Sequence, residues 1–197
     1  MAKRASGVLM HITSLPNQFG VGTFGKSAYD FVDFLEETDQ TYWQILPLTT
    51  TSYGDSPYQS FSAIAGNTHF IDFDLLAAAG YLREADYATV DFGNDPEQVD
   101  YERIYTARRP ILEKAVTTFL QEKSNKERLA QFEKKASWLT DYAEFMALKE
   151  HFGNKALTEW DDVKAIKRDP ATLATYRKEL EDKILFHKVV QYFFDQQ

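Results

Sequence analysis

Two short apolar segments near the start of the chain predict β-strands. Residues 8–13 form the first and end in a Ser-Leu-Pro turn, and residues 43–48 form the second. Between them, residues 26–37 carry apolar side chains at helical spacing, which predicts an amphipathic helix. This order predicts a βαβ unit, so we expect the two strands to be parallel and the first to be buried.

Beyond about residue 90 the pattern becomes helical. Apolar residues recur at helical spacing in three segments, which are residues 100–123, residues 138–152 and a last helix that begins after Asp169-Pro170. Pro110 should kink the first of these helices or start a new one. A shorter helix is expected over residues 74–79, because Gly80 follows it in a position suited to a C-terminal cap.

Composition and charge exclude several classes of protein. The 197 residues carry a formal net charge of −8, whereas nucleic acids and anionic membranes attract a basic surface. The absence of cysteine excludes disulfides, thiolate metal sites and cysteine nucleophiles. No apolar run is long enough to cross a bilayer or to form the core of a signal peptide. We therefore expect a cytoplasmic protein without a nucleic-acid or membrane partner.

A long loop after the second predicted strand carries the most suggestive chemistry. Between residues 49 and 67, many small hydroxyl residues surround a set of aromatic and amide side chains, namely Tyr53, Tyr58, Gln59, Phe61 and Asn67. Three residues of this loop favour defined turns, namely Gly54, Pro57 and Gly66. A sugar offers C–H faces that stack on aromatic rings and hydroxyls that need directional hydrogen bonds. The loop therefore favours a carbohydrate ligand.

Several motifs of this chain resemble those of one enzyme family. They are SGVLMHITSLP (residues 6–16), YWQILPL (42–48), YGDSPYQSFSAIAGN (53–67), WLTDYAEFMALKEHFG (138–153) and FHKVVQYFFDQQ (186–197). In order and spacing they are similar to the opening of 4-alpha-glucanotransferases, the amylomaltases or disproportionating enzymes of the alpha-amylase-like superfamily. The resemblance covers the chain nearly end to end.

The resemblance implies a fold class and a domain organisation. It implies an α/β chain that forms the N-terminal portion of a (β/α)8 TIM barrel, with the first two βα units followed by a mostly helical inserted subdomain. Residues 1–90 would start the catalytic barrel and carry the substrate-cleft loop. Residues 91–197 would form the helical subdomain and lead into the next barrel strand. Such a barrel needs about 250 residues, so the missing C-terminal part of the same polypeptide is an implied partner.

The resemblance also implies a function. The parent enzyme would transfer an alpha-1,4-glucan segment to the 4-hydroxyl of glucose or a maltooligosaccharide by a retaining mechanism, with no cofactor or metal. Ser56 would bind a sugar hydroxyl and Tyr58 would contact a sugar ring. Tyr53 and Tyr105 would form an accessory glucan-binding groove. The chain departs from the family at Asp39, where glycine is usual, and at Thr49-Thr50 and Thr68-His69, which puts the shape of those loops in question.

A search for catalytic carboxylates finds none in this chain. A retaining mechanism needs two carboxyl groups about 5–5.5 Å apart. Asp55 lacks an evident acidic partner. Asp72 and Asp74 could share one face of an extended segment, but capping of the short helix that follows is favoured. In the family the acids lie on later strands, so we assign no catalytic residue and expect the chain alone to be inactive. His11 is interpreted as a hydrogen-bonded structural histidine.

Two other functions remain open at this stage. The chain could be a non-catalytic glucan-binding module built around Tyr53 and Tyr105. It could also be a helical interaction protein that uses its amphipathic faces after residue 90. Loss of maltooligosaccharide binding on removal of the two tyrosines would favour the first alternative. Self-association without affinity for sugar would favour the second.

Overall fold

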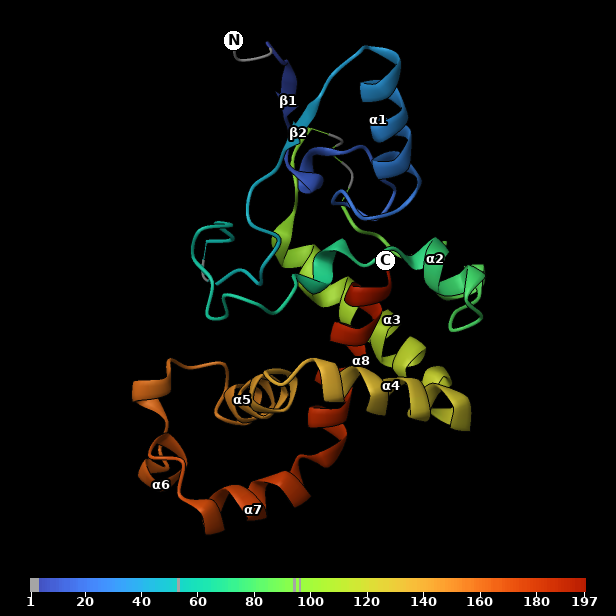
Figure 1. The fold of residues 1–197 in the computed structure, drawn as a ribbon. Helices are drawn as coiled ribbons and strands as arrows, with labels where there is room; N and C mark the ends of the chain where they lie inside the picture. The colour runs from blue at the N-terminus through green and yellow to red at the C-terminus, as the bar shows by residue number, and fades with distance from the viewer. Residues whose placement is uncertain (1–3, 53, 94, 96) are drawn as a thin grey trace. The chain divides into compact units, whose positions relative to one another are not determined.

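The computed structural model describes residues 4–52, 54–93, 95 and 97–197. The chain divides into two compact units, one made of residues 1–121 with 193–197 and the other of residues 122–192 (Figure 1). The first unit contains β1 (Gly7–Leu9), η1 (Ile12–Ser14), α1 (Lys26–Glu37), β2 (Tyr42–Gln44), η2 (Thr68–Phe70), α2 (Phe73–Ala78), η3 (Glu84–Asp86) and α3 (Tyr101–Gln121). The second contains α4 (Lys123–Lys135), α5 (Leu139–His151), η4 (Leu157–Glu159), α6 (Val163–Ile166) and α7 (Pro170–Glu179), and α8 (Glu181–Gln196) ends in the first unit. The described chain is mostly helical with one small sheet.

The two strands are parallel, as the βαβ pattern predicts, but they are shorter than expected. β1 and β2 pair over three residues, with Val8 opposite Trp43. One further hydrogen bond, from Met10 N–H to the Gln44 carbonyl at 3.0 Å, continues the pairing. The predicted strand over residues 8–13 is wrong at its end, because residues 12–14 wind into the 3-10 turn η1. The prediction of strand to Leu48 is also wrong, since regular pairing stops at Gln44.

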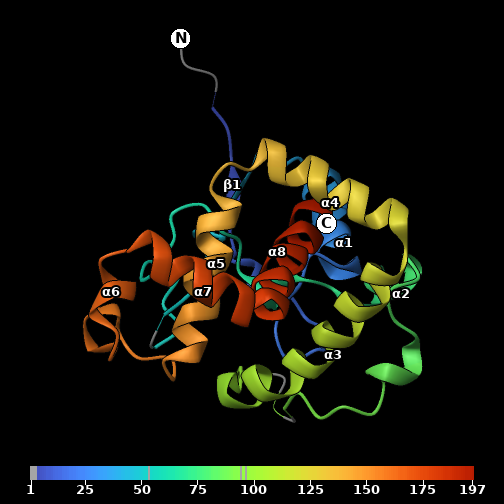
Figure 2. The same ribbon diagram turned by 90° about the horizontal axis from the view of Figure 1, so that it is seen from below.

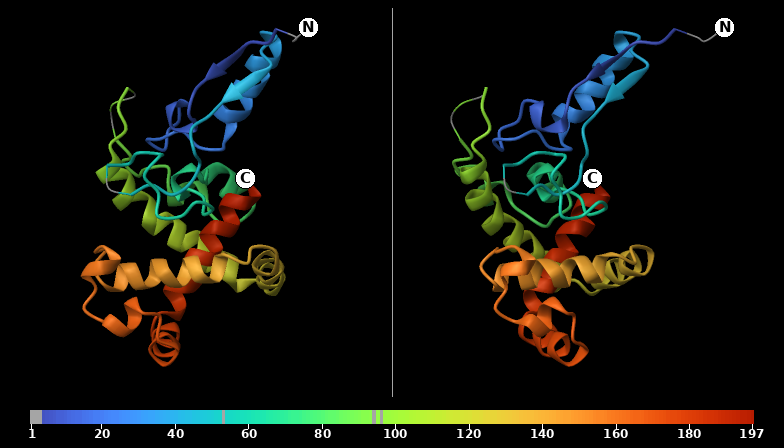
Figure 3. Two further views of the ribbon diagram at one scale, coloured as in Figure 1. Left: turned by 60° about the vertical axis from the view of Figure 1, so that its left-hand side comes forward. Right: turned by 90° about the vertical axis from the view of Figure 1, so that its left-hand side faces the viewer.

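The expectation that the first strand is buried is also wrong. Leu9 is 59% exposed and Tyr42 on β2 is 65% exposed. A sheet of only two strands leaves an outer face and both edges without cover. One face is covered by α1, whose bounds agree with the prediction, and Phe31 meets Trp43 edge to face with ring centroids 4.8 Å apart. Both views of Figure 3 show β1 and β2 side by side with α1 alongside them.

Two clusters of apolar side chains lie in the core of the first unit. One cluster joins Ile12, Leu15, Ala28 and Phe70, and partly buried side chains such as Trp43 and Phe194 pack against it. The other is an aromatic cluster with ring centroids 5.0–5.9 Å apart, made of Phe19, Phe73, Tyr87 and Phe92. Aromatic rings at these separations and angles attract each other beyond their area burial. The aromatic cluster packs the loop after β1, through Phe19, against Phe73 of α2.

The helices α2 and α3 partly agree with the sequence. Asp72 caps α2 by accepting a hydrogen bond from Leu75 N–H at 3.1 Å, as expected. Asp74 does not share that role, because it lies inside the first turn and accepts a hydrogen bond from the Tyr87 hydroxyl at 2.7 Å. Pro110 does not start a new helix. α3 continues through it without interruption, although a proline there removes one N–H donor from the helix.

The second unit is a group of helices around a core of its own. Its buried side chains are Ala147, Leu148, Trp160, Ala165, Leu173 and Leu180. α6 and α7 contact each other, and Figure 2 shows α6 to the left of α5 and α7 overlapping α5 in projection. The last predicted helix is two helices, α7 and α8, which separate at Leu180, the C-cap of α7. The start of α7 agrees with the sequence, since Asp169 accepts a hydrogen bond from Thr172 N–H at 2.9 Å.

Asp39 adopts a backbone conformation that glycine tolerates better. It follows α1 with φ of +53°, in the left-handed region, one residue after the C-cap Thr38. We expect Asp39→Gly to raise the free energy of unfolding by about 0.5–1 kcal/mol, because it removes the clash between Cβ and the backbone. Urea unfolding measures this change.

A matched control is Asp33→Gly, at an exposed position inside α1. It should lower the free energy of unfolding by about 1 kcal/mol, because glycine is a poor helix former. Equal destabilisation by both substitutions would contradict the strain assigned to Asp39.

Candidate functional site

The loop after β2 is closed at its base by backbone hydrogen bonds. Thr49 and Gly66 form an antiparallel bridge, and Thr50 N–H donates to the Ala65 carbonyl at 3.0 Å. Gly66 has no room for a side chain, since a Cβ there would lie 2.3 Å from the ring of Phe194. The sequence prediction of defined turns in this loop is therefore confirmed. Backbone hydrogen bonds and close packing at Gly66 give the loop a defined conformation.

The tip of the loop turns through two residues with positive φ. Gly54 has φ of +85° and Asp55 has φ of +54°. Ser52 N–H closes the turn by donating to the Gln59 carbonyl at 2.9 Å. Asparagine and aspartate tolerate this region better than other residues with a Cβ. The turn presents the carboxylate of Asp55 toward α3.

Asp55 connects the loop to α3. Its Oδ1 accepts hydrogen bonds from the Tyr105 hydroxyl at 2.7 Å and from the Thr51 hydroxyl at 3.4 Å. Burial of Tyr105, with a further contribution from the Asp55 carboxylate, raises the pKa of Tyr105 to about 12. The phenol therefore remains protonated and donates throughout the neutral range. Tyr105 also packs edge to face on His69, with ring centroids 4.7 Å apart.

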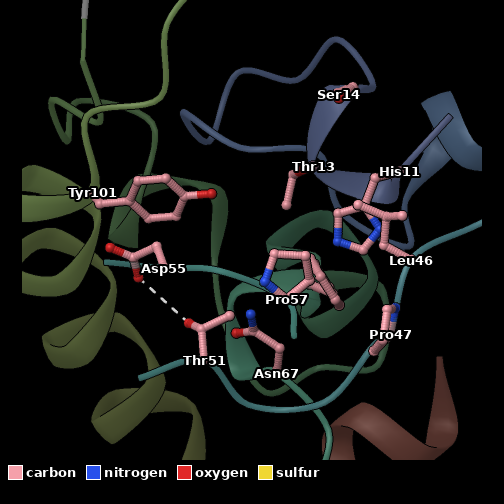
Figure 4. A pocket seen from close by; sticks show the side chains of 11 residues that line it. His11, Thr13, Ser14, Leu46, Pro47, Thr51, Asp55, Pro57, Asn67 and Tyr101 are labelled. Carbon is pink, nitrogen blue, oxygen red and sulfur yellow. Dashed lines mark hydrogen bonds between the residues drawn. The ribbon is translucent and has the colours of Figure 1, made fainter. Parts of the chain in front are cut away.

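A pocket of about 170 Å³ opens between this loop, the turn after β1 and the start of α3 (Figure 4). Its lining residues are His11, Thr13, Ser14, Leu46, Pro47, Thr51, Asp55, Pro57, Asn67, Phe70 and Tyr101. In Figure 4, Asp55 and Tyr101 lie at one end and His11 and Leu46 at the other. Hydroxyl, amide, imidazole and carboxylate groups alternate with apolar side chains. A ligand with hydroxyls around an apolar ring matches this mixture.

The predicted site residues lie around this pocket rather than in it. Tyr58 is 74% exposed, and Ser56 is half-buried with its Oγ accepting a hydrogen bond from Tyr58 N–H at 3.4 Å. Pro57, between them, lines the pocket. Tyr105 is 47% exposed and holds Asp55. Tyr53 lies outside the described residues. The roles assigned to these four residues stay predictions.

Sequence reasoning missed Tyr101 and misread His11. Tyr101 lies four residues before Tyr105 on α3, and this spacing places both on one face of a helix, so the pair could have been found together. The interpretation of His11 as a hydrogen-bonded structural residue is wrong in one respect. Its Nδ1 is buried and has no hydrogen-bond partner in the part of the chain that the structure describes.

The pocket can hold a ligand, but it lacks the groups needed to cleave one. Asp55 is the only carboxylate among its described lining residues, and it already accepts two hydrogen bonds. Retaining glycosyl transfer needs a pair of carboxyl groups. No group of three histidine, aspartate or glutamate side chains suited to a metal ion occurs among the residues that the structure describes. None of the described helices is both long and apolar enough to span a membrane.

Comparison with solved structures identifies the class of protein. The chain resembles the amylomaltase from Streptococcus agalactiae in complex with acarbose, with a TM-score of 0.97 and 62% sequence identity over 98% of this chain and 39% of that one. It shares a fold with the amylomaltase from Corynebacterium glutamicum, at a TM-score of 0.61 and 18% identity over 98% of this chain and 27% of that one. The chain therefore has the fold of amylomaltase segments.

Sequence comparison gives the family. A profile described as 4-alpha-glucanotransferase matches residues 10–197. The 4-alpha-glucanotransferase of Streptococcus pneumoniae serotype 4 is 58% identical over 197 residues, which is 100% of this chain and 39% of that protein. The 4-alpha-glucanotransferase of Thermus thermophilus is 43% identical over 98% of this chain and 38% of its own length. The chain belongs to the 4-alpha-glucanotransferase family and spans about two fifths of these relatives.

Proposed function

We propose that this chain supplies one wall of the glucan-binding cleft of a 4-alpha-glucanotransferase. The complete enzyme would transfer an alpha-1,4-glucan segment to the 4-hydroxyl of glucose or of a maltooligosaccharide. Family membership supports the reaction. The observation that carries the role of this segment is the pocket, where a structured loop brings hydroxyl, amide and imidazole groups around an apolar patch.

The proposed architecture assigns the bond-breaking acids to sequence that this chain does not include. Residues 1–90 would start a (β/α)8 barrel, and residues 91–197 would form the helical subdomain. The parallel β1–β2 pair joined through α1 supports the start of a barrel. Loops at the carboxyl ends of barrel strands build the active site in such folds, and the pocket loop follows β2. Cytoplasmic location and independence from cofactors and metals remain part of this proposal.

The proposed contacts with the glucan follow the exposed side chains beside the pocket. The ring of Tyr58 would stack on the face of a sugar, because it is 74% exposed and follows Pro57, which lines the pocket. The hydroxyl of Ser56 would bind a sugar hydroxyl. Tyr105, together with Tyr53, would provide a secondary contact surface, and the bond from Tyr105 to Asp55 would hold the loop in the shape that accepts the ligand.

The first test measures binding of maltotriose and maltoheptaose to this chain by titration calorimetry. We expect saturable binding that Tyr58→Ala weakens about tenfold, as for an aromatic anchor. The matched control is Tyr29→Ala, which removes a similarly exposed ring (56%) from α1 and should leave the affinity unchanged. Equal loss in both variants, or no binding at all, would contradict the proposed cleft.

The same preparation tests the assignment of the catalytic groups. Incubation of the chain with maltotriose should produce neither glucose nor longer oligosaccharides, because the pocket offers a single carboxylate. Clear turnover would place a catalytic pair inside these residues and would overturn that part of the proposal.

A further inference from the structure

His11 occupies the wall of the pocket, although its sequence context identifies it as a structural residue. It follows β1 and is the N-cap residue of η1. The side chain is 9% exposed, and the imidazole packs edge to face on Phe70 with ring centroids 5.5 Å apart. Figure 4 shows the ring beside Leu46 and Pro57 at one end of the pocket. The ring is therefore held in place in the wall of the pocket.

The hydrogen bonding of this ring is incomplete. Nδ1 is buried and has no partner among the described residues. A buried N–H without a partner is rarer in proteins than a buried acceptor with an unused lone pair. The tautomer with its proton on Nε2 is therefore favoured. Because Nδ1 is enclosed by protein while His11 lines the pocket, Nε2–H is the N–H group that the ring can offer to a ligand.

We propose that His11 is a glucan-binding residue whose Nε2–H donates a hydrogen bond to a sugar hydroxyl oxygen in the pocket. This inference rests on the proposed function and deepens it by naming a donor at a fixed position. Other lining groups, such as the hydroxyl of Thr13, are available to the same sugar unit. Because the packing on Phe70 fixes the direction of the donor, His11 would select hydroxyls by position rather than simply add affinity.

Burial supports this role rather than a role in proton transfer. Desolvation lowers the pKa of His11 from 6.5, its ordinary value. The imidazole is therefore neutral at pH 7 and acts as a donor without carrying a charge. A protonated ring would place a second N–H on the buried and unpartnered Nδ1, which the site does not accommodate.

Two variants separate the hydrogen bond from the shape of the ring. His11→Phe keeps a flat ring but has no donor, whereas His11→Gln places an amide N–H near the position of Nε2. We expect His11→Phe to weaken maltotriose binding about three- to tenfold, the effect of one lost hydrogen bond. His11→Gln should retain most of the affinity. Circular dichroism and thermal unfolding confirm that each variant folds.

A spectroscopic readout on the wild-type chain makes the test independent of whether the variants fold. Nitrogen-15 spectra of the histidine side chains should show His11 as the Nε2–H tautomer, with its Nε2 resonance shifting when maltotriose saturates the site. His151, exposed on α5 in the other unit, is the internal reference and should not shift.

The outcomes distinguish the failure of this inference from the failure of the proposed function. Absence of maltotriose binding by the wild type overturns both. Normal binding together with an unchanged His11 resonance, or with full affinity in His11→Phe, overturns only the role of His11. Equal loss of affinity in His11→Phe and His11→Gln with the fold intact also overturns it, because a side chain that keeps an N–H donor would then bind no better than one without a donor.

Discussion

Acidification should destabilise the first unit through His69. Burial of the imidazole, aided by the positive charge of Arg108, lowers the pKa of His69 from 6.5 to about 3. Between these values the unfolded chain binds a proton that the folded chain does not. The stability that the buried, neutral His69 allows is therefore fully present above pH 6.5. It is lost as the pH falls toward 3, because the unfolded chain then gains a proton that the folded chain does not bind. One pKa unit corresponds to about 1.4 kcal/mol, so the loss reaches several kcal/mol.

The variant His69→Phe isolates this effect. A phenyl ring can keep the edge-to-face contact with Tyr105 and cannot bind a proton. Urea unfolding at a series of pH values should show a shallower loss of stability in His69→Phe than in the wild type below pH 6.5. Tyr29→Phe, which removes only an exposed hydroxyl on α1, should keep the wild-type dependence. Identical profiles for wild type and His69→Phe would show that burial of this imidazole does not control acid stability.

Replacement of Arg108 should show that its buried charge lowers the free energy of unfolding, whereas the volume of its side chain raises it by filling space beside Phe73. Arg108 is 1% exposed, and its guanidinium lies over the ring of Phe73, 4.2 Å from the centroid. Nη2 donates to the carbonyl of Ile71, while Nε and Nη1 have no partner within the described residues. Burial lowers the pKa of Arg108 to about 9, against the opposing effect of the nearby Asp72 carboxylate.

We expect Arg108→Met to raise the free energy of unfolding by about 1–3 kcal/mol, because a flexible apolar side chain fills the same space without unpaired polar atoms. Arg108→Ala should instead lower it by about 2–4 kcal/mol, since it leaves a cavity beside Phe73. The carboxylate of Asp72 remains satisfied in both variants through the Thr23 hydroxyl at 2.5 Å and Leu75 N–H at 3.1 Å.

The effects of His69 and Arg108 on stability should also be coupled. Removal of the positive charge in Arg108→Met should raise the pKa of His69 toward its ordinary value, since that charge is one cause of the low pKa. The acid-induced loss of stability should then be smaller in Arg108→Met than in the wild type. Destabilisation of both Arg108 variants by equal amounts would show instead that the buried charge stabilises the fold.

These two sites illustrate what the sequence alone could not predict. Nothing in the local sequence around His69 indicates that Tyr105 and Arg108, both on α3, approach it. The contact requires α3 to return to η2 across the 30 residues, 71–100, that separate the two elements. A pKa depends on burial and on neighbours in space, and both are set by that return.

The sequence by itself determined the elements whose signals are local. The apolar spacing of α1, the cap of α2 by Asp72 and the start of α7 at Asp169-Pro170 all rest on residues close together in the chain. The parallel direction of β1 and β2 followed from the order strand, helix, strand. The family motifs are local in the same sense, and they identified the enzyme class.

The tertiary structure alone decided the lengths of the strands and the composition of the pocket. β1 and β2 stop after three residues because pairing in a sheet depends on partners far away in the sequence. His11, Asn67 and Tyr101 meet around one cavity because a turn, a loop and a helix converge there. Sequence periodicity predicts which face of its own helix or strand a side chain occupies. A binding site also depends on which other elements pack against that face, and the sequence pattern does not give this.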